Sequence, residues 1–144
     1  MVSLISPGVV IKVSSTLDKS VGKKNLIDGS PETCWTSQQG LPQTITLILP
    51  SSSPRGVIPK SLSITFQGGF VGRTCAIHAR SVDRTHSDLA GKANWRLLTY
   101  VYPEDMERDV NELGITALRL TFETSSDFFG RVTVYDLDLK GYLA

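Results

Sequence analysis

The sequence predicts an all-β fold, an antiparallel sandwich or barrel of about eight strands. Several short runs alternate apolar and polar residues, as a strand does when one face is buried and the other meets solvent. Glycine- and proline-containing turn signals separate these runs, and no segment longer than about ten residues has a convincing apolar helical period. This combination is typical of an all-β domain rather than a mixed or helical one.

The length, net charge and apolar content of the chain limit the possible classes of function. A chain of 144 residues is long enough for one domain with a full core, so residues 1–144 are expected to form a single unit. The formal net charge is +1, with acids and bases interspersed, so neither a nucleic acid nor an anionic membrane is indicated as a partner. The first residues do not resemble a signal peptide, and no apolar segment approaches the roughly 20 residues that span a bilayer.

The two cysteines, Cys34 and Cys75, both lie in apolar contexts. They can pair, but buried free cysteine is a good core residue, and two thiols do not make a disulfide framework. We therefore expect reduced thiols and an intracellular protein.

Four strands are predicted in the first half of the chain. The first is a β-branched run after the turn signal at Pro7 and Gly8, and three further runs alternate apolar and polar residues. The predicted strands are residues 9–15, 44–49, 61–66 and 74–79. Residues 24–27 are expected to form a single helical turn, and residues 50–59, rich in serine and proline, a surface loop.

The second half contains four more predicted strands. Residues 104–113 have a helix-like composition, but their apolar positions are too sparse for a helix face, which favours a turn and a short edge strand. Polar or glycine-containing loops are expected at residues 83–94 and 125–130. The four strands are residues 95–102, the short strand within 104–113, residues 117–122 and residues 132–139.

The last predicted strand changes phase. Val132 and Val134 share one face, whereas Leu137 and Leu139 lie on the other parity, so a β-bulge is expected near residues 135–136. Asp136 has the inward parity of the two valines, and a buried carboxylate without a partner is costly. Either the bulge turns Asp136 outward, or a positive group meets it.

Residues 25–35 are expected to form a rigid loop, which carries either a site or a corner of the fold. Asp28 and Gly29 are a turn pair, and Ile27 and Trp35 are expected to be the buried apolar anchors at its ends. Asp28 and Thr33 offer side-chain oxygens of the kind that Ca²⁺ binds. The alternative is that both side chains only cap the turn through backbone hydrogen bonds.

The sequence of residues 25–37, Asn-Leu-Ile-Asp-Gly-Ser-Pro-Glu-Thr-Cys-Trp-Thr-Ser, resembles the signature of discoidin-like (F5/8 type C), galactose-binding-like domains. Residues 66–70, 102–105 and 126–132 resemble, more narrowly, a nuclear-receptor-associated repressor family. Together the resemblance covers about residues 13–141. It implies an eight-stranded antiparallel jelly-roll sandwich without catalysis, which binds a protein partner, nuclear receptor-like, in the nucleus or cytoplasm, as a monomer or heterodimer. A ciliary relative, a subunit of the intraflagellar transport complex, shares only the first motif and implies a transport-complex subunit as the partner.

The resemblance also implies a structural calcium site. In discoidin-like domains that have one, this loop supplies the side chains matching Asp28 and Thr33 and backbone carbonyls, here those of Leu26, Ser30 and Thr33. An acid of the last strand completes the set, and Asp136 is the matching position. The family usually has glutamate there, and aspartate has a shorter reach.

Partner-binding candidates lie in two loops. Phe128 and Phe129 are adjacent aromatics that cannot both face one core, and aromatic residues with Arg131 have the composition of interface hot spots. The alternative is that both rings pack around a tight turn at Gly130. Phe70, at the tip of a glycine-rich connection, is either an exposed binding residue or folds back over the open end of the sandwich.

Other site chemistry is weakly indicated. His78 and His86 have no metal-pair spacing, and no phosphate-binding loop or nucleophile motif occurs. A carbohydrate-binding function is a further alternative, for which Trp95, Arg73 and Asn94 are the available residues. An enzyme is not indicated.

Overall fold

The computed structural model describes residues 2–5, 8–50, 56–81, 95–101, 107–109 and 114–143. Within them the chain forms ten strands and two short 3₁₀ turns, and every strand pairing is antiparallel. The strands are β1 (Val2–Ser3), β2 (Val10–Val13), β3 (Trp35–Thr36), β4 (Gln43–Ile48), β5 (Val57–Phe66), β6 (Gly72–Ser81), β7 (Trp95–Val101), β8 (Glu107–Asp109), β9 (Ile115–Ser125) and β10 (Thr133–Leu143). The 3₁₀ turns are η1 (Lys19–Val21) and η2 (Lys23–Leu26).

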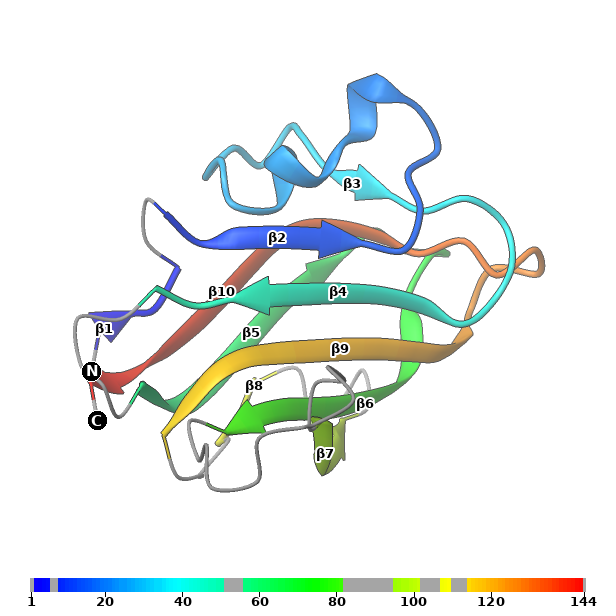
Figure 1. Ribbon diagram of the computed structural model, residues 1–144. Coiled ribbons are helices and arrows are strands. Elements are labelled where there is room, and N and C mark those ends of the chain that lie inside the picture. Colours follow the sequence, from blue (N-terminus) through cyan, green and yellow to red (C-terminus); the bar gives the residue numbers. More distant parts are fainter. Residues whose placement is uncertain are drawn as a thin grey trace, which may run out of the picture.

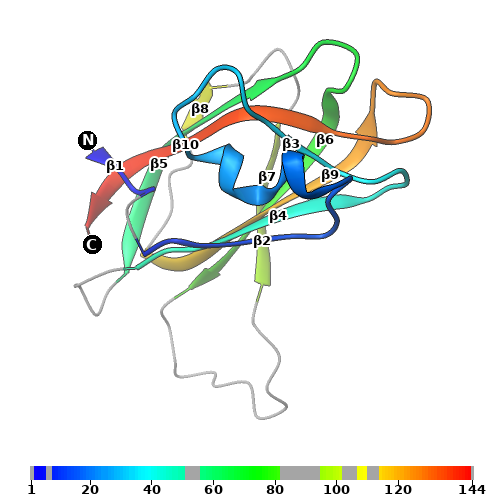
Figure 2. The ribbon, with the colours of Figure 1, turned by 90° about the horizontal axis from the view of Figure 1, so that it is seen from above.

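The strands form two layers that face each other (Figures 1 and 2). In the first layer the order is β2-β4-β9-β6-β7. In the second, β10 lies between β5 on one side and the two short strands β1 and β3 on the other, and β8 extends the layer from β5. The pair of Val57 with Ile115 joins β5 to β9, so the layers are one curled sheet.

All eight predicted strands are present, and the edge strand expected within residues 104–113 is β8. The two additional strands, β1 and β3, have two residues each. One boundary is wrong: β5 begins at Val57, inside the predicted surface loop. Pro59 is tolerated there because it lies opposite Gly141, where the register of β10 shifts, and proline in a sheet is confined to edges and such irregularities.

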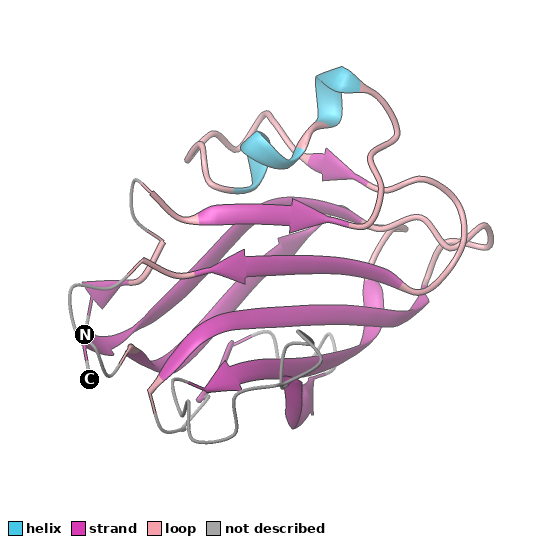
Figure 3. Cartoon of the chain, in the orientation of Figure 1, coloured by secondary structure: helices cyan, strands magenta, loops and turns pink. Residues whose placement is uncertain are grey.

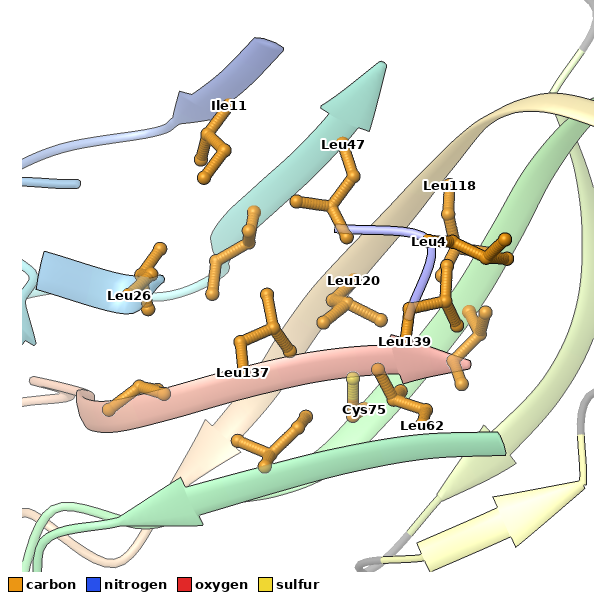
Figure 4. Close-up of a cluster of buried hydrophobic side chains, with 14 of the residues drawn as sticks. Leu4, Ile11, Leu26, Leu47, Leu62, Cys75, Leu118, Leu120, Leu137 and Leu139 are labelled. Carbon is orange, nitrogen blue, oxygen red and sulfur yellow. The ribbon is translucent and has the colours of Figure 1, made fainter. Parts of the chain in front are cut away.

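The core lies between the layers and is filled by the alternate residues that the strand pattern predicts (Figure 4). Ile45, Leu47, Ile77, Leu118 and Leu120 are fully buried. One of the expected inward positions differs in degree rather than direction: Phe66 is only partly buried, and its ring packs edge-on against the buried Phe122 with centroids 5.7 Å apart.

The predicted bulge in the last strand is confirmed. The register of β10 against β5 shifts between Val134 and Asp136, and Leu137 and Leu139 are buried beyond the shift. Asp136 is exposed. The bulge therefore turns this carboxylate to solvent, which removes the cost of burying it.

The predicted helical turn at residues 24–27 is present as η2, whereas η1 was not predicted (Figure 3). The carboxylate of Asp18 caps η1 by accepting a hydrogen bond of 2.8 Å from the Ser20 N–H. Within the described residues, no helix has the length and hydropathy that crossing a membrane requires.

Candidate functional site

One end of the sandwich is built from three loops and is called the apex below. The loops are residues 38–42, 67–71 and 126–131, and they lie at the opposite end from β1 and the end of β10 (Figures 1 and 2). The backbone N–H of Gly40 donates to the carbonyl of Phe129 at 2.8 Å, and the N–H of Ser126 donates to the carbonyl of Val71 at 2.9 Å. The Val71 N–H donates in turn to the Ser126 hydroxyl at 2.8 Å. These bonds make the three loops one continuous surface.

The loop 126–131 is closed by Asp127. Its carboxylate Oδ2 accepts hydrogen bonds of 3.0 Å from both the backbone N–H and the Nε of Arg131. The Gly130 N–H also donates to the Asp127 carbonyl at 3.0 Å, with Gly130 at φ 80°. The hydrogen bond from the Arg131 side chain, followed by that from its backbone, lowers the pKa of Asp127. The turn therefore has a fixed shape and a negative charge that is matched inside the loop.

This closed turn holds two aromatic rings in solvent. The side chain of Phe128 is 93% exposed and that of Phe129 is 52% exposed. Their ring centroids are 5.2 Å apart in an edge-to-face arrangement. The alternative that both rings pack around Gly130 is wrong, because both rings are exposed, and the carboxylate of Asp127 and the backbone close the turn instead.

Phe70 and Arg131 join the same group. The Arg131 guanidinium carbon lies 5.2 Å from the centre of the Phe70 ring and 5.8 Å from that of Phe129. Phe70 is partly buried, so of its two expected positions it takes the one folded back over the end of the sandwich. The structure thus brings the four predicted partner-binding residues together: Phe70 and Phe129 lie beside the Arg131 guanidinium, and Phe128 contacts the ring of Phe129.

Leu41 belongs to the apex and was missed from the sequence. It is half exposed. A side chain at Gly130 would approach its Cγ at 3.0 Å, so the two loops are in close contact. An isolated leucine among glutamine, glycine and proline was the available signal.

The Asp28 loop, residues 28–33, is anchored differently from the expectation. Trp35 is fully buried, as predicted, and its Nε1 donates to the carbonyl of Ser15 at 3.1 Å. The other predicted anchor is wrong: Ile27 is 37% exposed, and the fully buried residue is its neighbour Leu26. The reason is the direction of η2, which turns Leu26 into the gap between β10, β3 and β2.

Within this loop the Asp28 carboxylate points back at its own chain. Oδ1 accepts from the Ser30 N–H at 2.9 Å, and Oδ2 accepts a short hydrogen bond from the Thr33 hydroxyl. The bond from Thr33, followed by the one from Ser30, lowers the pKa of Asp28. The same Thr33 oxygen lies 3.4 Å from the Ser30 carbonyl oxygen. Three of the predicted calcium-binding residues therefore lie together.

Asp136 faces this loop across a cleft of about 420 Å³. Gly29, Ser30 and Pro31 line one wall, and Thr65, Tyr135 and Asp136 line the other. Within the described residues, no hydrogen bond joins Asp136 to the loop. The sequence also gave no weight to Asp138, two residues further along the same face of β10, which accepts from the Ser3 hydroxyl at 2.6 Å and lines an adjoining cleft with Asp136.

The Asp28 loop offers several of the donor types that a calcium ion needs. Carboxylate, hydroxyl and carbonyl oxygens of Asp28, Thr33 and Ser30 are the hard ligands that Ca²⁺ prefers, and the lowered pKa keeps Asp28 ionised at neutral pH. Among the described residues, no three of His, Cys, Asp and Glu form a cluster. The residues therefore fit a calcium site of few charges, in which Asp136 would have to reach across the cleft.

The remaining candidate residues do not converge. Trp95 pairs with Arg80 near one end of β6, whereas Arg73 lies near the other end, about 23 Å away along the strand. His86 and Asn94 lie outside the described residues, and His78 is partly buried on β6. Cys34 and Cys75 are free thiols, as expected, and burial raises the pKa of the Cys75 thiol to about 12.

Comparison with known proteins gives full-length relatives, although no family model matches the chain. The chain is 37% identical over 146 residues to the nuclear receptor 2C2-associated protein of Xenopus laevis, covering 96% of this chain and 98% of that one. It is 36% identical over 149 residues to the mouse protein of the same name, covering 96% and 95%. The human protein of that name is 36% identical over 145 residues, covering 96% of both chains.

Solved structures share the fold. An F5/8 type C domain from Bacteroides fragilis superposes with a TM-score of 0.72 at 15% identity, covering 95% of this chain and 93% of that one. The family 32 carbohydrate-binding module of Clostridium perfringens NanJ, in complex with galactose, has a TM-score of 0.64 at 17% identity, covering 91% and 92%. Chitosan-binding module 1 from a Paenibacillus enzyme has a TM-score of 0.68 at 16% identity, covering 92% and 94%. The galactose-binding-like sandwich predicted from the sequence is therefore confirmed.

Proposed function

Because this chain belongs to the family of nuclear receptor 2C2-associated proteins, we propose that it is a non-enzymatic module that binds a protein partner through its apex. The names of its relatives describe an association with another protein and no catalytic activity. The same names make a nuclear receptor the first candidate partner.

The observation that carries the proposal is the exposure of Phe128. A phenylalanine that is 93% exposed gains almost nothing from folding, and Phe129 beside it is 52% exposed. Aromatic residues close to an arginine are the residue types that supply most of the binding energy at protein interfaces. Because Asp127 and the backbone already fix the turn, a partner would lose little entropy in ordering it.

The proposal also covers the cellular location of the chain and its effect on transcription. A nuclear receptor partner implies work in the nucleus and the cytoplasm, and the narrower resemblance of residues 66–70 and 126–132 supports repression of transcription as the outcome. A reporter gene driven by the receptor tests this: expression of the chain should lower its output, and unchanged output would remove the repressor role.

The two alternatives have less support. The transport-complex alternative, with a cilium or flagellum as its location, rests on the 25–37 motif alone. Carbohydrate binding is a property of the NanJ and chitosan-binding modules by their titles. In this chain the guanidinium carbon of Arg119 lies 4.2 Å from the centre of the Trp95 ring, so the ring that would stack on a sugar already carries a neighbour.

The test is the affinity of purified nuclear receptor 2C2 for the wild-type chain and two variants, measured by calorimetry. Phe128→Ala should weaken binding by about tenfold or more, because it removes the outermost aromatic side chain. Tyr142→Ala is the matched control: Tyr142 is an aromatic of β10 that is 48% exposed and lies away from the apex. Equal losses in both variants, or binding that Phe128→Ala leaves intact, would overturn the apex as the binding surface.

We also propose that the Asp28 loop holds a structural calcium ion. Asp28, Thr33 and the carbonyl oxygens of Leu26 and Ser30 would bind it from the loop, and Asp136 would bind it from β10. When bound, the ion would supply a positive charge that fixes the loop against the last strand, and its role would be structural.

Thermal unfolding with and without millimolar Ca²⁺, after chelator treatment, tests the calcium proposal. At a hundredfold excess over its dissociation constant, an ion that binds only the folded chain adds about 2.7 kcal/mol to stability. The shift should disappear in Asp28→Ala and remain in Asp18→Ala, which instead removes the exposed carboxylate that caps η1. No shift in the wild-type chain would leave the loop as a structural corner.

A further inference from the structure

The outer face of the first layer carries a second group of side chains suited to binding. Across the five neighbouring strands, one row of paired positions runs through Lys12, Thr46, Arg119, His78 and Leu97. In the next row Arg80 pairs with Trp95. These positions alternate with the buried residues of the same strands, so they lie on the face turned away from the core.

Two arginines are held against one indole ring on this face. The guanidinium carbon of Arg119 is 4.2 Å from the centre of the Trp95 ring, and that of Arg80 is 5.5 Å from it. The Nε of Arg119 donates to the Thr46 hydroxyl at 3.1 Å, and the Nε of Arg80 lies 3.5 Å from the Thr116 hydroxyl. Both guanidinium groups are therefore positioned before any ligand arrives, and their terminal N–H groups are the ones left to recognise one.

Among the residues that the structure describes, the charges of this face are not balanced. Within the described part of the chain, the one ion pair joins Asp127 and Arg131 at the apex, so neither Arg80 nor Arg119 has a carboxylate partner there. Lys12 adds a third cation in the row of Arg119, whereas Glu123 is the one acid at the outward positions of β2, β4, β6 and β9. This excess is local, because the whole chain carries a net charge of only +1.

We propose that this surface, the basic face (Lys12, His78, Arg80, Trp95 and Arg119), docks an acidic segment of a partner protein. Carboxylates would bind the terminal N–H groups of the two arginines, the geometry that a guanidinium fork prefers. Leu97 and Val10, each about half exposed, flank the charges and would cover aliphatic side chains of the same segment. The proposal rests on the proposed function only in requiring a protein partner, and it adds a surface separate from the apex.

A nucleic acid fits this face less well. Single strands bind by stacking bases on open aromatic rings, whereas Trp95 is already stacked by Arg119. Proteins that neutralise many phosphates also carry a strongly basic patch on a basic chain, and this chain has a pI of about 7.8.

The test uses a short labelled peptide of alternating glutamate and leucine, titrated at low ionic strength into the full chain. Fluorescence anisotropy gives the affinity, and tryptophan emission gives the place: the chain has two tryptophans, and Trp35 is fully buried, so quenching reports on Trp95. Arg119→Gln should weaken binding by about tenfold. Lys140→Gln, which removes an exposed charge from β10, should change the affinity by less than about twofold.

The remaining measurements distinguish an acidic segment on the basic face from other ligands and from binding at the apex. The peptide with glutamine in place of glutamate should not bind, and a single-stranded oligonucleotide of equal length should bind more weakly than the acidic peptide. Phe128→Ala should leave peptide binding unchanged, since it alters the apex alone; if it abolishes binding, the acidic segment binds at the apex, and the basic face is wrong while the proposed function stands. Absence of binding, equal affinity in Arg119→Gln with an unchanged melting temperature, or preference for the oligonucleotide overturns the proposal.

Discussion

The Asp28 loop and the loop 126–131 are closed by the same local arrangement and present opposite chemistry to solvent. In each, an aspartate accepts a hydrogen bond from a backbone N–H and another from a side chain of the same loop, which lowers the pKa of the carboxyl group. Each loop also contains a glycine with positive φ, 73° at Gly29 and 80° at Gly130.

The difference lies in the closing partner and in the surroundings. A neutral hydroxyl closes the Asp28 loop, which faces a cleft that holds Asp136 on its far wall. A guanidinium closes the other loop, which presents Phe128 and Phe129. The same kind of aspartate-closed turn thus occurs with different chemistry at its surface. The function of each loop is decided by residues that the turn does not need for its own closure.

The largest expected effect concerns what anchors the Asp28 loop. Leu26→Ala should lower the free energy of unfolding by about 3 kcal/mol, because it empties a fully buried site between the layers. Ile27→Ala, at the exposed neighbouring position, should cost less than about 1 kcal/mol. Denaturant titration of both variants checks this, and a larger loss in Ile27→Ala would reinstate Ile27 as the anchor.

The two glycines provide the next test. Gly130→Ala should cost about 2 kcal/mol, because the new Cβ would need a left-handed backbone and would lie 3.1 Å from the carbonyl carbon of Gly40. Gly29→Ala should cost only about 1 kcal/mol, since nothing lies within 4 Å of its new Cβ. Thermal unfolding of both variants measures the difference, and equal costs would mean that the apex loops do not press on each other.

The third test uses pH and salt to distinguish the two closures. The folded pKa of Asp127 and of Asp28 lies below the ordinary value of 3.8, so the stability that each carboxylate adds is present above that pH and is lost as the pH falls through the folded pKa. Asp127→Asn and Asp28→Asn should therefore lower the melting temperature at neutral pH and approach the wild-type value in acid.

Salt separates the pair. Because Asp127 is closed by a cation, the deficit of Asp127→Asn should shrink in about 1 M NaCl, whereas that of Asp28→Asn should not. Melting curves at two salt concentrations provide the measurement. A deficit of Asp28→Asn that also shrinks in salt would indicate that a charge, and not the Thr33 hydroxyl, holds that loop.

The smallest effect is expected at the most exposed residue. Phe128→Ala should change the free energy of unfolding by no more than about 0.5 kcal/mol, because the ring has almost no buried surface to lose. Chemical denaturation of the variant used in the receptor experiment checks this directly. A loss above about 1 kcal/mol would mean that the ring packs on the fold and is not held out for a partner.

Alternation predicted the strands well because each layer has one buried face, which fixes the side-chain period at two. The same reasoning located the bulge at residues 135–136, since few structures other than a β-bulge change the phase of alternation within a strand. The prediction failed at Val57–Pro59, because the nearby serines and prolines indicated a loop. These residues pair with β10 instead, and a register shift in β10 permits the proline. It also failed at Ile27, because a turn of four residues has no period from which to read its buried side.

For the candidate sites, too, the sequence predicted local features but not contacts between distant segments. The residue types at 126–131 made an exposed aromatic one of two alternatives, and the packing of Leu41 against this loop depends on how distant segments of the chain meet. The stacking of Arg119 and Arg80 on Trp95 likewise joins three strands, and only the strand order places them together. Local spacing carries information about turns, whereas surfaces that combine several loops or strands require the topology.

The position of the apex relative to the chain ends has a practical consequence. β1 pairs with the last residues of β10, so both described ends lie side by side at the end of the sandwich away from the loop 126–131 (Figure 1). A tag, a fluorescent label or a linker to a solid support, attached at either end, would therefore leave the molecule on the far side from the aromatic rings. Immobilised in this way, every molecule would present its apex to the bulk solution in the same orientation.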